Sequence, residues 1–204
     1  QIATHTADAA AILEHLRTPP AIVVGTSAGA AIAVDLAVRR PDLLQAVLAH
    51  EFPWRFTRHL PTVSQVAALA TIGSLVLRRR HGDAAEALLR AAYTYRDGAT
   101  AWDDFPEAWR WIARQNAKAA LADFRNSIGT YPTRAELATI KVPVMCTYGA
   151  RSPNTMARLV RSLATAIPTA TTRQIEGAGH AAPFDATSNF VQLIADAIVP
   201  VTRE

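Results

Sequence analysis

Apolar residues follow two patterns that alternate along the chain. Short apolar runs, rich in β-branched residues, predict strands at 21–25, 46–49 and 140–149, and a final strand is predicted at 171–176. Apolar positions with a helical period predict helices at 6–17, 28–39, 154–166 and 184–198. Strands that alternate with helices in this way predict an α/β fold with a mostly parallel sheet flanked by helices.

The strand pattern is interrupted between residues 54 and 138. Helical periodicity covers most of this stretch, with predicted helices at 63–79, 84–95 and 106–124. All four tryptophans of the chain fall within it. Helices inserted between two strands of a parallel sheet are typical of a lid. We therefore divide the chain into a first core part (1–53), a helical cap or lid (54–138) and a second core part (139–204).

Composition narrows the class of protein. The chain has 204 residues, half of them hydrophobic, which is enough for one sizeable core. The net charge of +4 includes one arginine run, Arg78-Arg79-Arg80, without the aromatic-interleaved basic stripe of a nucleic-acid-binding protein. Cys146 is the only cysteine, so no intramolecular disulfide can form. We expect a cytoplasmic protein with a small-molecule substrate and with no nucleic-acid or membrane partner, and we make no prediction of its oligomeric state.

The first candidate for chemistry lies between the strand at 21–25 and the helix at 28–39. Gly25-Thr26-Ser27-Ala28-Gly29 has the form G-x-S-x-G in the strand-turn-helix setting of a nucleophile elbow. We expect Gly25 and Gly29 to leave room for the tight turn, which exposes the Ser27 hydroxyl. The amide of Ala28, at the start of the helix, is placed to donate to an oxyanion. Ser27 is thus the candidate nucleophile; the alternative is a purely structural glycine-rich turn.

The second candidate group lies near the other end of the chain. His180 follows the last predicted strand, in the loop Gly177-Ala178-Gly179-His180. Groups that follow the carboxyl ends of parallel strands gather at one edge of the sheet, so Ser27 and His180 can meet. A histidine at that position takes the serine proton and returns it to the leaving group.

The elbow, the order of strands and lid, and the G-A-G-H loop before a closing helix resemble an α/β-hydrolase over nearly the whole chain. The resemblance implies a Ser-acid-His triad, a backbone oxyanion hole and a helical cap that shapes the substrate pocket. It implies no metal and no organic cofactor.

The triad acid departs from the family pattern. The family usually has aspartate in a G-x-x-D turn, and the matching turn here, Gly149-Ala150-Arg151-Ser152, ends in serine. Since serine carries no charge, we assign the acid role to Glu51, directly after the second predicted strand. Its alternative role is to anchor the entrance of the lid, through an ion pair with Arg55. Asp185 is a weaker candidate for the acid.

The start of the chain also departs from the family pattern. The family has strands before the elbow and a loop that supplies a second oxyanion amide, and neither pattern precedes Ser27 here. Together with the missing initial methionine, this predicts an N-terminal truncation. A chain that truly began at Gln1 would be expected to fold poorly and to turn over little substrate.

Two classes of function follow. The first is a serine hydrolase of carboxylic-ester-hydrolase type, which cleaves a small, mostly apolar ester, lactone or amide through an acyl-enzyme on Ser27. The second is a protein of the same fold that binds a small ligand with little or no turnover. An inactive fragment is a third reading.

Overall fold

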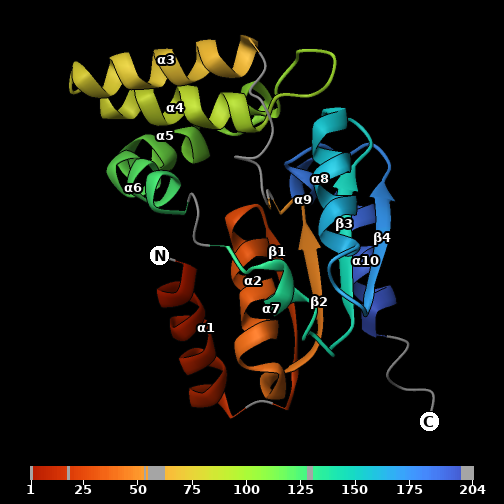
Figure 1. Cartoon of the computed structure of the whole chain (residues 1–204). Helices are drawn as coiled ribbons and strands as arrows, with labels where there is room; N and C mark the ends of the chain where they lie inside the picture. The colour runs from red at the N-terminus through yellow and green to blue at the C-terminus, as the bar shows by residue number, and fades with distance from the viewer. Residues whose placement is uncertain (1, 18, 53, 55–62, 128–130, 199–204) are drawn as a thin grey trace.

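A computed structural model describes residues 2–17, 19–52, 54, 63–127 and 131–198. Its sheet has four parallel strands in the order β1 (Ala21–Thr26), β2 (Leu44–His50), β3 (Val144–Gly149) and β4 (Ala170–Ile175) (Figure 1). Thr26 pairs with His50, and Gly149 pairs with Ile175. The carboxyl ends of neighbouring strands are therefore aligned at one edge, and the predicted parallel α/β architecture is confirmed.

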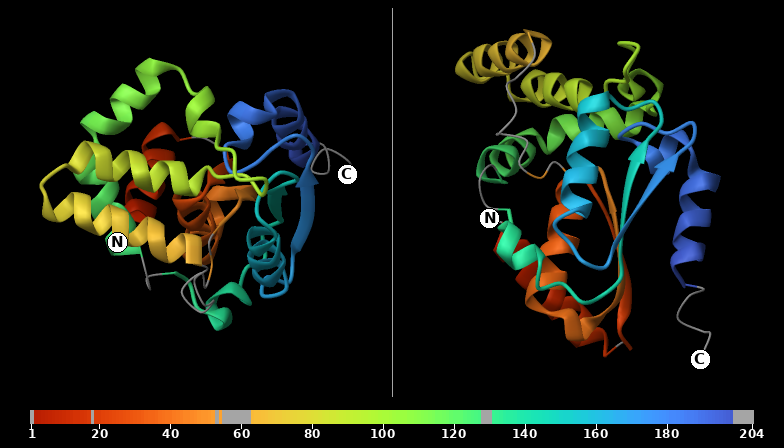
Figure 2. Two further views of the ribbon diagram at one scale, coloured as in Figure 1. Left: turned by 90° about the horizontal axis from the view of Figure 1, so that it is seen from above. Right: turned by 45° about the vertical axis from the view of Figure 1, so that its right-hand side comes forward.

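Helices cover both faces of this sheet, and the alternation of side chains along the strands explains why. On β2, Val47 and Ala49 belong to the main core cluster, whereas Leu48 between them belongs to a second cluster. The main cluster is covered by α1 (Ile2–Leu16), α2 (Ala28–Arg39) and α8 (Asn154–Ala164). The second is covered by α9 (Ala182–Asp185) and α10 (Thr187–Ile198), on the opposite face (Figure 2). Strands buried on both faces have nearly continuous apolar sequences, as the central strands β2 and β3 do, whereas the outer strand β4 is largely exposed.

The segment between β2 and β3 is helical, as its periodicity predicts. Its elements are α3 (Val63–Leu77), α4 (His81–Ala92), the 3₁₀ turn η3 (Ala101–Asp104), α5 (Glu107–Gln115), α6 (Ala117–Ser127) and α7 (Arg134–Leu137). Figures 1 and 2 place α3 to α6 on the side of the molecule toward which the strands point. We call these four helices, with the connections between them, the cap. Leu137 of α7, by contrast, is buried in the main core cluster.

Several predicted elements have different bounds in the structure, among them the helices expected at 6–17 and 84–95, which are Ile2–Leu16 and His81–Ala92. The helix expected over 106–124 is two helices, α5 and α6, which meet at Asn116, where the side-chain amide and the backbone amide both donate to the Ile112 carbonyl at 3.0 Å. The helix expected over 184–198 is likewise divided into α9 and α10, with a non-helical backbone at Ala186 (φ −143°, ψ 54°). The strand expected from 140 begins only at Val144, after Pro143, which has no amide to donate.

Candidate active site

The turn at Ser27 has the strained backbone of a nucleophile elbow. Ser27 joins β1 to α2 with φ 54° and ψ −118°, a left-handed conformation that is uncommon for a residue with a side chain. Its amide donates to the His50 carbonyl at 2.9 Å, and its carbonyl accepts from the Ala31 amide at 3.2 Å. The Ser27 side chain makes no capping hydrogen bond to α2. The neighbouring strand and the following helix thus hold the turn without using the hydroxyl.

The two glycines of the elbow differ in their importance. A β-carbon on Gly25 would lie 2.3 Å from the Gly29 carbonyl oxygen, so no side chain fits at position 25. A β-carbon on Gly29 would meet no atom within 4 Å. The expectation that both glycines make room is therefore right for Gly25 and wrong for Gly29. A side chain at position 25 would collide with the backbone of the first turn of α2, whereas a side chain at position 29 would not.

Glu51 and His180 are brought together from distant parts of the chain. Glu51 directly follows β2, with φ 50°, and is completely buried. Its Oε2 accepts a hydrogen bond from His180 Nδ1 at 2.7 Å, and its Oε1 accepts from the Gly149 amide at 2.9 Å. Both carboxylate oxygens therefore have a donor, which is the condition for keeping a charge buried.

The ionisation of Glu51 results from opposing effects. Burial by itself raises the pKa of this carboxyl, but the hydrogen bond and positive charge of His180, with smaller contributions from His50 and the Gly149 amide, hold its pKa below the ordinary value. A carboxylate only accepts hydrogen bonds, so the proton of neutral His180 lies on Nδ1. Nε2 of the imidazole is then left to accept a proton.

A second histidine, His50, lies behind this pair and was not assigned a role from the sequence. Its Nε2 lies 3.1 Å from the Gly179 carbonyl and its Nδ1 lies 3.0 Å from Thr147 Oγ1. Burial lowers the pKa of His50, which favours the neutral ring. Because a carbonyl only accepts, Nε2 carries the proton and Nδ1 accepts from the Thr147 hydroxyl. The available signal was its position next to Glu51 at a strand end.

The alternative acids occupy other positions. Ser152 lies in the turn after β3 and is buried, and its Oγ has no hydrogen-bond partner among the described residues. Asp185 accepts hydrogen bonds from the Gly179 amide at 2.7 Å and the Tyr95 hydroxyl at 2.6 Å. Arg55, the suggested partner of Glu51, lies outside the described residues.

The N-terminus of α2 faces the elbow. Ala28 is the first residue of this twelve-residue helix, whose first amides have no partner within the helix. Aligned peptide dipoles make such an end favourable for negative charge. The amide of Ala28 adjoins the Ser27 side chain in sequence, which is the arrangement that an oxyanion donor requires.

Aromatic rings connect His180 to the cap. The Tyr93 ring, at the end of α4, lies 5.6 Å from the His180 ring and 5.0 Å from the Phe105 ring. Phe105 in turn lies 5.0 Å from Phe184 of α9, and Trp109 of α5 lies 5.7 Å from Phe184. We call Tyr93, Phe105, Trp109 and Phe184 the aromatic strip. Trp109 is 52% exposed, so the strip runs from His180 to the surface.

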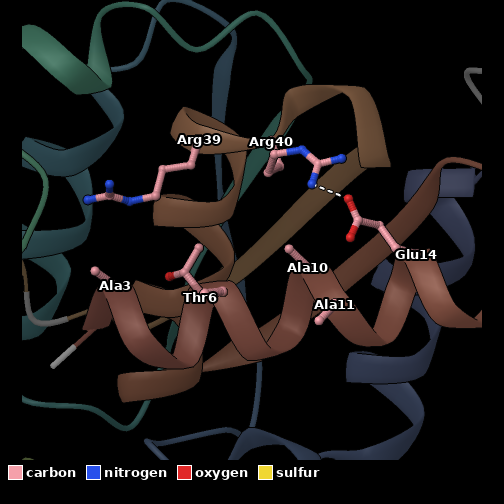
Figure 3. Close-up of a pocket in the computed structure, with 8 residues that line it drawn as sticks. Ala3, Thr6, Ala10, Ala11, Glu14, Arg39 and Arg40 are labelled. Carbon is pink, nitrogen blue, oxygen red and sulfur yellow. Dashed lines mark hydrogen bonds and ion pairs between the residues drawn. The ribbon is translucent and has the colours of Figure 1, made fainter.

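The described residues contain a further hollow, and it is not an evident binding site. A hollow of about 350 Å³ lies between α1 and α2, lined largely by alanines (Figure 3). Its charged groups already have partners, because Arg40 pairs with Glu14 and Arg39 pairs with Asp35. No cluster of three or more His, Cys, Asp or Glu side chains suited to a metal ion occurs in the described part of the chain.

Over the same residues, no helix combines the length and apolarity needed to cross a membrane.

Comparison with known proteins defines the family. The model of the alpha/beta hydrolase family matches residues 2–193, so the chain belongs to that family. No protein with a curated description matches it by sequence.

Solved structures are similar over almost the whole chain. An enzyme that degrades N-acyl homoserine lactones has a TM-score of 0.70 at 20% identity, over 96% of this chain and 74% of its own. An enol-lactonase from Burkholderia xenovorans has a TM-score of 0.69 at 19% identity, over 97% and 72%. A bromoperoxidase from Bacillus anthracis has a TM-score of 0.74 at 16% identity, over 97% and 74%. At these identities the likeness concerns the fold.

Proposed function

We propose that the protein is a serine hydrolase that cleaves a small ester, lactone or amide through an acyl-enzyme on Ser27. The observation that carries the proposal is the 2.7 Å hydrogen bond between the buried Glu51 and the partly buried His180, since both residues and the strained turn at Ser27 follow strands of the sheet. A buried carboxylate that is hydrogen-bonded to one ring nitrogen of a histidine orients the ring and stabilises its protonated form. Both effects favour proton transfer at the other ring nitrogen.

Each group has a defined role in the proposed reaction. His180 Nε2 takes the hydroxyl proton as Ser27 Oγ attacks the substrate carbonyl carbon, and the Ala28 amide donates to the oxygen that becomes negative. Collapse of the tetrahedral intermediate breaks the bond to the leaving group, which receives the proton from His180. A water molecule then attacks the acyl-enzyme in the same way and releases the acid. Glu51 stabilises the imidazolium in both halves of the reaction.

The aromatic strip supports a mostly apolar substrate. Its rings extend from His180 toward solvent, and a ring surface of this kind binds apolar groups by removing them from water. Two of the structural relatives act on lactones by name, which is compatible with this class. The bromoperoxidase, whose TM-score of 0.74 is slightly higher than those of the two lactone-degrading enzymes, shows why the relatives do not select the reaction by themselves.

The alternative is a ligand-binding protein with little turnover. It is favoured by one observation, the serine at position 152 in place of the usual family acid. Ser152 Oγ has no partner in the described structure, so it supplies neither charge nor a hydrogen bond to His180.

Labelling with a fluorophosphonate probe distinguishes the serine hydrolase from the ligand-binding protein. Such probes phosphonylate a serine that is activated as a nucleophile. We expect the protein to gain one phosphonyl group by intact-protein mass spectrometry, Ser27→Ala to gain none, and Ser152→Ala to label as the parent does. Absence of labelling in the folded parent would favour the binding protein, and labelling that persists in Ser27→Ala would place the nucleophile elsewhere.

A further inference from the structure

The residue before His180 is held on both sides. The Gly179 carbonyl accepts from His50 Nε2 at 3.1 Å, and the Gly179 amide donates to Asp185 Oδ2 at 2.7 Å. These two bonds fix the peptide groups that flank Gly179. Because the next peptide unit carries His180, the position of its α-carbon depends on both bonds.

Asp185 connects this loop to the cap. Its second oxygen, Oδ1, accepts from the Tyr95 hydroxyl at 2.6 Å. Tyr95 follows α4 and is almost completely buried. Burial, reinforced by the Asp185 carboxylate, raises the pKa of Tyr95, so its hydroxyl stays protonated and donates. The Asp185 carboxylate thus accepts one hydrogen bond from the His180 loop and one from the cap.

The Tyr95 ring packs closely on the same loop. A β-carbon on Gly179 would lie 2.5 Å from Tyr95 Cε1, so the ring occupies the space that glycine leaves open. The Arg151 guanidinium lies 3.5 Å from the ring centroid, and the Arg151 amide donates to the Ala178 carbonyl at 2.7 Å. The turn after β3, the His180 loop and the cap therefore meet at Tyr95.

We infer that Tyr95 and Asp185 are positioning residues for His180, through which the cap sets the direction of the imidazole at the proposed active site. The contact acts through the Gly179 peptide, since neither side chain hydrogen-bonds the His180 ring in the described structure. Catalytic groups work within roughly 0.5 Å of the productive geometry, and a displacement of about 1 Å costs on the order of 10²-fold in rate. A cap residue can therefore affect turnover without touching substrate.

The test uses variants that remove one contact each. Tyr95→Phe deletes only the hydroxyl that donates to Asp185, and Asp185→Ala removes the acceptor of both donors. Asp185→Asn keeps one oxygen that can accept from the Gly179 amide. The matched control is Tyr148→Phe, because Tyr148 is also a buried tyrosine whose hydroxyl is hydrogen-bonded in the described structure, accepting from Arg161 at 2.6 Å.

Two readouts separate positioning from general stability. The first is the downfield proton resonance of His180 Nδ1, assigned by its loss in His180→Asn, which reports the bond to Glu51 without any turnover. The second is kcat and KM for p-nitrophenyl butyrate hydrolysis, and this readout rests on the proposed function. Thermal unfolding of each variant is measured alongside.

We expect Tyr95→Phe to shift or broaden the Nδ1 resonance and to lower kcat about tenfold, with KM changed less than about twofold. Asp185→Ala should have a larger effect, and Asp185→Asn should recover part of it. Tyr148→Phe should lower the unfolding temperature by a similar amount but leave both the resonance and kcat as in the parent. Equal loss in Tyr95→Phe and Tyr148→Phe, or an unchanged resonance in Tyr95→Phe, would overturn the inference. If the parent neither hydrolyses the ester nor labels at Ser27, the proposed function fails, and the resonance alone decides the positioning role.

Discussion

Substitution of Glu51 by glutamine tests the proposed acid with the smallest possible change in shape. In the parent, Glu51 Oε1 accepts from the Gly149 amide and Oε2 accepts from His180 Nδ1. A glutamine has one acceptor and one donor at these positions. Its carbonyl oxygen must face Gly149, because the reverse orientation would leave a buried amide without an acceptor at a cost of about 1–3 kcal/mol. The amide nitrogen therefore faces His180.

This orientation changes the imidazole as well as removing the charge. Loss of the charge-assisted hydrogen bond to the carboxylate costs about 1.5–3 kcal/mol, which corresponds to about 10- to 150-fold in rate. In addition, the glutamine nitrogen donates to Nδ1, so the ring proton of His180 moves to Nε2. Nε2 then cannot accept the proton of Ser27, and a comparable substitution in serine proteases costs about 10⁴-fold. We expect kcat/KM to fall about 10²- to 10⁴-fold in Glu51→Gln.

The assay is p-nitrophenyl butyrate hydrolysis, with Ser152→Ala as the matched control. Because the Ser152 hydroxyl has no partner in the described structure, its removal should change kcat/KM by less than about twofold. Circular dichroism of both variants checks that they are folded. A folded Glu51→Gln variant within tenfold of the parent, or a greater loss in Ser152→Ala, would refute the assignment of Glu51 as the acid.

Three further outcomes follow from the structure. Gly25→Ala should yield no cooperatively unfolding protein, because of the 2.3 Å contact described above, whereas Gly29→Ala should match the parent or be stabilised by up to about 1 kcal/mol in thermal unfolding; the same outcome for both would contradict the elbow geometry. Trp109→Ala should lower kcat/KM for an aryl ester by about three- to tenfold, and Trp111→Ala, equally exposed on the same helix, should lower it by less than about twofold; equal losses would exclude the aromatic strip as a substrate surface. Because the folded-state pKa of Glu51 lies below its ordinary value of 4.5, its stabilisation is complete above that pH and is lost as the pH falls through the folded-state pKa. The difference in urea-unfolding free energy between the parent and Glu51→Gln should accordingly shrink on acidification, and a widening difference would speak against the depressed pKa.

The agreement between sequence and structure is good where a local pattern has one physical meaning. A buried parallel strand is apolar on both faces, so the central strands β2 and β3 could be located from their apolar runs, with ends shifted by a few residues. The elbow at Ser27 could be found because a strand, a tight turn and a helix occur within a dozen residues. Helix ends were harder to predict, since the helical period over 106–124 does not mark the break at Asn116, where the side-chain amide and the backbone amide both donate to the Ile112 carbonyl.

The site was only partly predictable for a related reason. Glu51 was a candidate because it ends a strand, but the same position was compatible with an anchor for the lid. Its hydrogen bond to His180 joins residues that are 129 positions apart in the sequence. A local sequence pattern does not show whether two such distant residues are in contact. His50 was missed because a histidine on an apolar strand has no periodic signature, and its contact with Gly179 depends on the order of strands in the sheet.

The chain's own residues determined the class of fold, the turn that strains Ser27 and the loop that carries His180, because each arises from interactions within a few residues. Only the tertiary structure decided that Glu51 is paired with His180, that Gly149 holds the other carboxylate oxygen, and that Tyr95 of the cap contacts the His180 loop through Asp185. Those contacts join segments that are distant in the sequence and that the parallel sheet and the cap bring together, so no local pattern can predict them.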